Sequence, residues 1–160
     1  MVERQTIEKV RTDATDCSEE VLESEFEQFF SNQPAICNFV MDVTSEGNQS
    51  AGELALYMSF VVYKSLLLDR DGSLESVGNE EIADACSESG DWVHRMSETE
   101  ETGVESPSLS KLNDEPYLIS YVISEVHDAI KNGLELTEEE KGAVFFVLTA
   151  VIESLTANSN

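Results

Sequence analysis

Proline and glycine are scarce in this chain of 160 residues, which holds three prolines and eight glycines. Because these residues punctuate turns, their scarcity predicts long uninterrupted segments and argues against the frequent turns of a β-sandwich. The hydrophobic fraction of 41% is large enough for a core, so the chain as a whole is not expected to be disordered. These features predict an all-α fold.

Basic residues are also few, with 9 Lys and Arg against 33 Asp and Glu and a formal net charge of −24. Proteins bind DNA and RNA by releasing counterions from phosphates with Lys and Arg, so this balance excludes a nucleic acid as a direct ligand. Association with anionic membranes is disfavoured for the same reason. A basic protein surface would instead be attracted.

Cysteines and long apolar runs are limited too. Cys17, Cys37 and Cys86 are widely spaced and form no CxxC pair, so free thiols are expected. The first residues, MVERQTIEKV, contain no apolar signal region. The longest apolar stretch, 54–68, contains Lys64 and is shorter than the roughly 20 residues of a spanning helix. The sequence thus predicts a reduced, soluble, cytoplasmic protein.

Apolar residues at helical spacing predict a compact bundle of five to six helices. Two segments, 50–68 and 138–156, are apolar nearly all round and are expected at its centre. Ser50 with Glu53, and Thr137 with Glu140, have the spacing of capping boxes that open these two helices. Further helices are expected after Ser18, over about 34–44, from Asn79, and over 116–132.

The domain organisation follows from composition. Residues 17–160 are predicted to form a single helical domain, preceded by a loose arm or frayed helix over 1–16. The segment 97–113 is rich in Ser and Glu and is expected to be a mobile loop.

One internal similarity suggests a duplication. Residues 59–72 align without gaps against 120–133, with matching Ser, aromatic, β-branched and Gly positions at a fixed offset of 61. Two related helical hairpins, 50–96 and 114–157, would explain the match. The general pattern of a helix, a glycine stop and a capped helix produces the same match, so both interpretations stay open.

The stretch Asp69-Arg70-Asp71-Gly72 has the look of a calcium loop. With Gly72 at the sixth position, the first and twelfth ligand positions fall on Leu67 and Gly78, which carry no carboxylate. The corresponding loop around Gly133 also lacks a ligand, because Ile130 fills the third position. The stretch is therefore interpreted as a turn between helices.

An acidic stripe offers a different chemistry. Glu81, Asp84, Glu88 and Asp91 lie along one predicted helix face, where their carboxylates would suit Mg²⁺ or Ca²⁺. A divalent-cation-dependent phosphohydrolase-like enzyme is the alternative function that this stripe indicates. Such an enzyme also needs a facing acidic helix and cationic groups for phosphate, which the sequence scarcely supplies. A solvated helix face is the preferred interpretation.

Other catalytic signals are missing. His94 and His127 belong to no HExxH or zinc-finger spacing, and the chain contains no GxSxG, P-loop or GxGxxG motif. No catalytic residue or cofactor is therefore predicted.

The preferred function is a non-enzymatic interaction domain that binds a basic protein partner, in an inhibitor, immunity-type or nucleic-acid-mimic role. Its predicted contact residues are the glutamates of two acidic segments: Glu19, Glu20, Glu23, Glu27, Glu98, Glu100 and Glu101. A third interpretation is a homo-oligomer whose interface uses surplus aromatic residues, namely Phe29, Phe30, Tyr117 and Tyr121.

Overall fold

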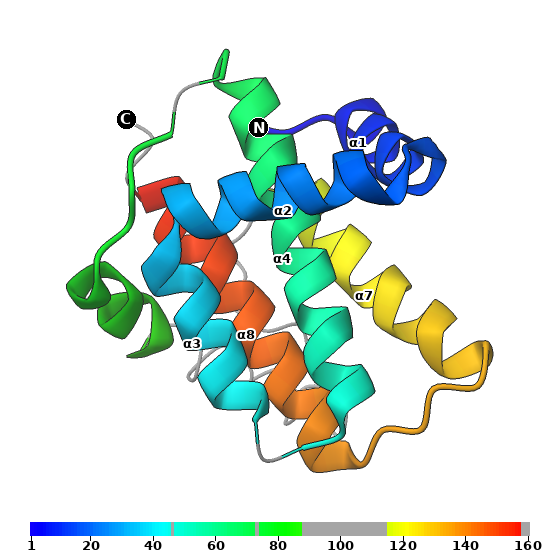
Figure 1. Ribbon diagram of the computed structural model, residues 1–160. Coiled ribbons are helices and arrows are strands. Elements are labelled where there is room, and N and C mark those ends of the chain that lie inside the picture. Colours follow the sequence, from blue (N-terminus) through cyan, green and yellow to red (C-terminus); the bar gives the residue numbers. More distant parts are fainter. Residues whose placement is uncertain (46, 73, 88–114, 158–160) are drawn as a thin grey trace.

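The computed structural model describes residues 1–45, 47–72, 74–87 and 115–157 (Figure 1). Over these residues all regular structure is helical, which confirms the all-α class. Six helices and a seventh helical segment over 79–87 exceed the predicted five to six by one. The six are α1 (Arg4–Asp16), α2 (Glu19–Asn32), α3 (Pro34–Thr44), α4 (Gln49–Asp69), α7 (Pro116–Lys131) and α8 (Glu138–Ala157).

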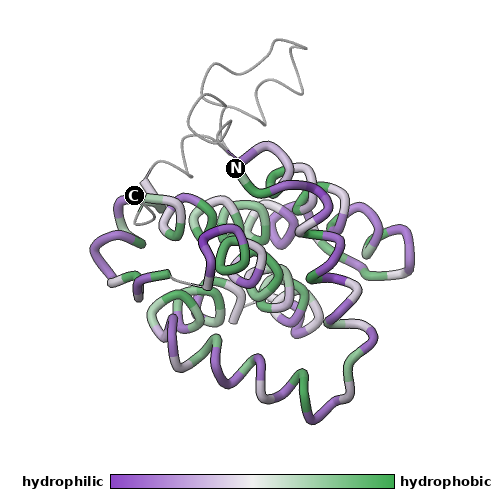
Figure 2. The backbone as a smooth tube through the Cα atoms, turned by 90° about the horizontal axis from the view of Figure 1, so that it is seen from above, coloured by the Kyte–Doolittle hydropathy of each residue, from purple (hydrophilic) through white to green (hydrophobic). Residues whose placement is uncertain are grey.

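Helices α4 and α8 pack against each other at the centre, and α3 lies against both (Figure 1). Their apolar residues are buried around most of the helix circumference, as in Met58, Val61 and Leu66 of α4 and Leu148 and Ile152 of α8. Figure 2 shows the apolar segments towards the middle of the molecule and the polar ones towards its outside. A helix apolar on all sides is stable in water only when other helices cover it, which places these two inside.

Helix α4 extends beyond the apolar run seen in the sequence, to 21 residues. By length and composition alone it could cross a membrane, and 56% of its most apolar window is buried inside the protein. The core helix of a globular protein meets the same criterion, so this property by itself assigns no membrane.

The N-terminal residues were predicted to be a loose arm or a frayed helix, and Arg4–Asp16 form helix α1, packed on α4 and α7. Val2, Ile7 and Val10 are buried, with 0%, 2% and 5% of their surfaces exposed. The segment is polar on average, but these few apolar side chains share one face, and burying them stabilises the helix.

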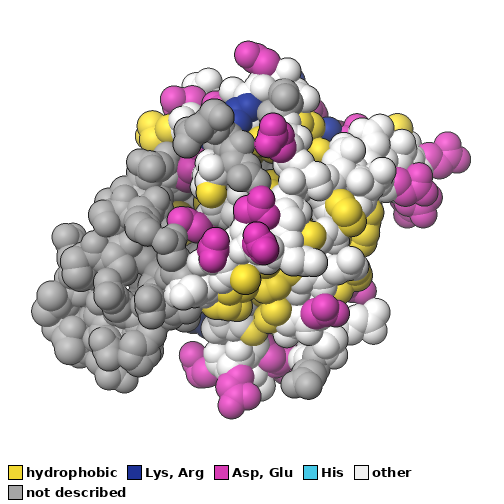
Figure 3. All heavy atoms as spheres, turned by 90° about the vertical axis from the view of Figure 1, so that its left-hand side faces the viewer, with side chains coloured by type: hydrophobic (Ala, Val, Ile, Leu, Met, Phe, Trp, Pro, Cys, Tyr) yellow, Lys and Arg dark blue, Asp and Glu magenta, His cyan; other side chains and the backbone are white. Residues whose placement is uncertain are grey.

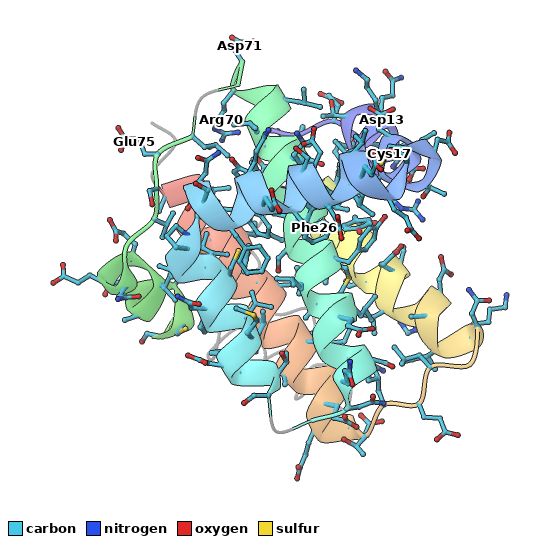
Figure 4. The ribbon with its side chains drawn as sticks, viewed as in Figure 1. Asp13, Cys17, Phe26, Arg70, Asp71 and Glu75 are labelled. Atoms are coloured by element: carbon cyan, nitrogen blue, oxygen red, sulfur yellow. The ribbon has the colours of Figure 1, made fainter. Side chains whose placement is uncertain are left out.

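Helix α2 crosses the bundle and is anchored to α4 by aromatic rings. Phe26, labelled in Figure 4, stacks on Phe60 with ring centroids 4.4 Å apart, and Phe29 stacks on Tyr63 at 4.9 Å. Offset aromatic pairs of this kind add about 0.5–1.5 kcal/mol beyond the area they bury.

The corner between α2 and α3 holds a fully buried glutamine, Gln33. Its Oε1 accepts the backbone N–H of Val77 at 2.9 Å, and its Nε2 donates to the carbonyl of Glu75, also at 2.9 Å. The extended segment after α4 has no sheet partner, so one side chain satisfies its backbone groups. Gln33 therefore fixes the path of the chain into the helical segment 79–87.

The two predicted capping boxes have different outcomes. At α8 the prediction is confirmed, because Glu140 N–H donates to Thr137 Oγ1 at 3.1 Å and Thr137 N–H donates to Glu140 Oε1 at 3.0 Å. At α4 it is wrong, because the cap is Asn48, whose Oδ1 accepts the N–H of Ser50 at 2.9 Å. Glu140 also accepts the N–H of Asn48 at 2.6 Å, so one carboxylate holds the starts of both central helices.

Candidate functional site

The acidic face of α2 comprises Glu19, Glu20, Glu23 and Glu27, and all four side chains are exposed. Ser18 caps the helix by accepting the N–H of Val21 at 3.2 Å, and Glu19 and Glu20 then lie in the first turn. Carboxylates at this end interact favourably with the helix dipole. Local sequence thus sets both the start of α2 and the outward direction of its charges.

Among the residues that the structure describes, no cation forms an ion pair with these four carboxylates. Over the described ranges, the ion pairs of Arg11, Lys64 and Arg70 involve other acids, and none involves the acidic face of α2. Glu25, on the same helix but half-buried, is the α2 acid that pairs with Lys64 of α4. The acidic face therefore presents its full negative charge to solvent.

An apolar side chain stands among these acids. Val21, in the first turn of α2, has 49% of its surface exposed. In the view of Figure 3 many acidic and few basic side chains are visible, with apolar side chains exposed between the acids. Charged groups interspersed with apolar contacts are a common composition at the margins of protein interfaces.

The second predicted acidic segment, with Glu98, Glu100 and Glu101, and the mobile loop 97–113 lie outside the described residues. The same holds for Glu88 and Asp91 of the acidic stripe. These contact and metal predictions stay predictions.

In the described half of the stripe, Glu81 caps its helix and Asp84 does not. Glu81 Oε2 accepts the backbone N–H of Gly78 at 2.9 Å, and Asp84 is exposed. Across the part of the chain that the structure describes, no three His, Cys, Asp or Glu side chains come close enough together to hold a metal ion. Glu81 acts as a cap for its own helix here.

The stretch resembling a calcium loop is a helix stop. Asp69 pairs with Arg70 at 2.9 Å, and Asp71 has φ of 56° and points away from the molecule (Figure 4). Gly72 follows with φ of 81°, and its N–H donates to the carbonyl of Leu67 at 2.7 Å. This is the hydrogen bonding of a left-handed C-terminal cap.

The aromatic interface predicted for a homo-oligomer is only partly exposed. Phe29 is fully buried and Tyr121 is 7% exposed, so neither can contact a second copy without unfolding the core. Phe30 and Tyr117 are half-buried. Two of the four residues predicted for this interface therefore belong to the core, and oligomerisation itself stays a prediction.

Sequence reasoning did not foresee the polar contacts between α1 and α7. Arg11 Nη1 donates to Glu8 at 3.0 Å, and Arg11 Nη2 lies 3.3 Å from Glu125. Burial raises the pKa of Glu125, and the guanidinium of Arg11 opposes that shift. The i, i+4 pair of Tyr117 and Tyr121 was a signal for this face, but its partner helix was not predicted.

A buried carboxylate at the start of α7 was also missed. Glu115 is 4% exposed, and its Oε2 accepts the N–H of Val2 at 2.9 Å. Its other oxygen lies 4.0 Å from the guanidinium of Arg70. Burial raises the pKa of Glu115, while the Val2 N–H and the nearby cations lower it.

Comparison of the chain with models of protein families, with curated proteins and with solved structures finds no match. A functional argument therefore rests on the surfaces of this chain alone.

Proposed function

We propose that this chain is a non-catalytic interaction domain that binds a basic protein through the acidic face of α2. The observation that carries the proposal is the gathering on one helix of four exposed glutamates that form no ion pair within the described ranges: Glu19, Glu20, Glu23 and Glu27. A reduced cytoplasmic setting, and an inhibitor, immunity-type or nucleic-acid-mimic role, belong to the same proposal.

Two physical features support it. The aromatic contacts of Phe26 and Phe29 hold α2 in place before a partner arrives, so binding orders little backbone. The net charge of −24 attracts a basic partner from a distance and speeds its association. The rest of the acidic surface contributes to this attraction, and the α2 face supplies the contact.

The experiment begins with capture from a cell lysate at low ionic strength, followed by elution with increasing NaCl. A basic protein released by salt is identified, purified and titrated against the chain by calorimetry. Because exposed charges are screened over a Debye length of about 8 Å at physiological ionic strength, affinity is expected to fall steeply with salt.

Matched variants then separate a local contact from net charge. In the first, Glu19, Glu23 and Glu27 are replaced by Gln. In the control, Asp42→Asn, Glu53→Gln and Glu135→Gln remove the same charge from exposed positions near the opposite end of the bundle (Figure 1). The proposal predicts at least a tenfold loss of affinity for the first variant and little change for the control. Equal losses would show that net charge alone attracts the partner and would contradict a site on α2.

A further inference from the structure

A second surface, separate from the acidic face of α2, lies between α1 and α7. There the two helices enclose a pocket of about 220 Å³. Two of the chain's four arginines, Arg4 and Arg11, line it together with Tyr117 and Tyr121. Half of the arginines of this chain, which has few cations, therefore line one pocket.

The two arginines have different surroundings. Arg11 lies 5.8 Å from the centroid of the Tyr121 ring and is held by Glu8 and Glu125. Arg4 lies over the ring of Tyr117 at 5.3 Å, and within the described residues no carboxylate pairs with it. The planar guanidinium of Arg4 therefore keeps its N–H donors for another group.

An independent observation points to a ligand at the same place. Tyr121 is 7% exposed, and its hydroxyl is buried without a hydrogen-bond partner in the structure. Glu125, Arg11 and Glu8, three of the titratable groups that act on this hydroxyl, line the pocket, and Tyr57 acts on it from α4. A buried hydroxyl without a partner is unfavourable, so a molecule that completes its hydrogen bonding would bind favourably.

The chemistry of the lining selects the ligand. Ser120 and Ser124, one turn apart on α7, add hydroxyl donors beside Arg4, so the available groups suit an oxygen-rich acceptor. Glu8, Glu125 and Asp128 line the same pocket and repel a second negative charge, which disfavours a phosphate dianion. The volume is below the roughly 300–1,000 Å³ of typical ligand sites, so the molecule is small.

We propose that this pocket binds a small organic monocarboxylate. Arg4 pairs with the carboxylate, the Tyr117 ring covers the apolar part, and the Tyr121 hydroxyl hydrogen-bonds to the bound molecule. This site acts independently of the basic partner proposed for α2, because the two surfaces share no residue.

The test titrates the whole chain with butyrate, benzoate and inorganic phosphate, following backbone amide signals by NMR. Butyrate or benzoate is expected to produce saturable shifts centred on residues 117–124, and phosphate is not. Arg4→Gln is expected to weaken this binding at least tenfold, whereas Lys131→Gln, an exposed cation at the far end of α7, changes it less than twofold.

Tyr121→Phe keeps the ring and removes the hydroxyl. Without ligand this variant is expected to melt at the same temperature as the parent or higher, because the lost group had no partner. It is expected to bind butyrate or benzoate several-fold more weakly. Its melting temperature would then show that the weaker binding is not caused by unfolding.

Failure of both carboxylates to saturate, tighter binding of phosphate, or unchanged binding in Arg4→Gln would overturn the proposal. Destabilisation of the free protein by Tyr121→Phe would also overturn it, since the hydroxyl would then have a partner already.

Discussion

At the scale of single residues, burial determines which ionisable groups are chemically available. Cys37 is fully buried, and burial raises its pKa to about 12, so its thiol is protonated and unreactive at neutral pH. Glu115 and Glu125 are acids whose pKa burial also raises, and each is held beside an arginine. The four glutamates of the acidic face of α2, by contrast, are exposed.

Glu115→Gln tests the cost of burying this acid. Because its folded-state pKa is raised, the folded protein binds more protons than the unfolded one from 4.5 up to that pKa, and stability falls as pH rises through this window. Glutamine keeps an acceptor for the Val2 N–H and has no charge. The variant is expected to gain stability relative to the parent between pH 4.5 and 7, measured by urea denaturation at each pH.

The control, Glu115→Ala, removes the acceptor and leaves the Val2 N–H unsatisfied. It is expected to lose about 1–3 kcal/mol at all pH values in this range. If glutamine destabilised the protein as much as alanine, the ion pair with Arg70 would outweigh the burial cost and the argument would be wrong.

At the scale of secondary structure elements, a few side chains join segments that are distant in sequence. Gln33 holds the segment after α4, and Glu140 joins the starts of α4 and α8.

Replacing Gln33 by Met keeps the length of the side chain and removes both hydrogen bonds. We expect a loss of about 1–3 kcal/mol in the free energy of unfolding, because the buried Val77 N–H loses its acceptor. Urea denaturation measures it, and Asn38→Met, an exposed change on α3, is the control.

Glu140 gives the opposite pH dependence to Glu115. Hydrogen bonds from the Thr137 and Asn48 N–H groups lower its pKa, so its contribution is present above 4.5 and is lost as pH falls through the lowered folded-state value. Glu140→Gln is expected to be less stable than the parent at pH 7. The gap should narrow below pH 4.5 in thermal melts of both proteins across pH. A gap that stayed constant with pH would show that the carboxylate charge is irrelevant.

Some elements could be predicted from local sequence patterns, whereas others depend on tertiary contacts. The helices α4 and α8 were predictable because they are apolar on nearly every face. Helix α1 could not be predicted in this way, because its segment is polar. The three buried residues of this segment, Val2, Ile7 and Val10, belong to the core only because α4 and α7 cover them. The acidic face of α2 followed from helical spacing, whereas Gln33 and the pocket of Arg4 and Tyr121 depend on tertiary contacts that no local pattern contains.

The duplication stays a prediction at this scale. Both aligned segments end in left-handed caps. The backbone N–H that donates the 5→2 hydrogen bond of the cap belongs to Asp71 in one segment and to Gly133 in the other. These positions are one residue out of register with the alignment. The caps are therefore similar in kind but differ in position.

At the scale of the whole molecule, a core built on α4 and α8 supports a surface of strong negative charge. Self-repulsion in such a molecule favours unfolding, and the folded state persists because burial of apolar surface outweighs it. The same charge provides the long-range attraction that the proposed function requires. In that proposal the specificity of binding comes from the acidic face of α2, which forms no ion pair in the part of the chain that the structure describes.

Hydrogen exchange of the complex with the salt-released basic partner tests this claim most directly. Mass spectrometry would follow the amides of α2 and those of α1 and α7 with and without the partner. The account predicts added protection over residues 19–30, with no change over 4–16 or 116–131. Protection confined to α1 and α7, or spread evenly over the surface, would contradict it.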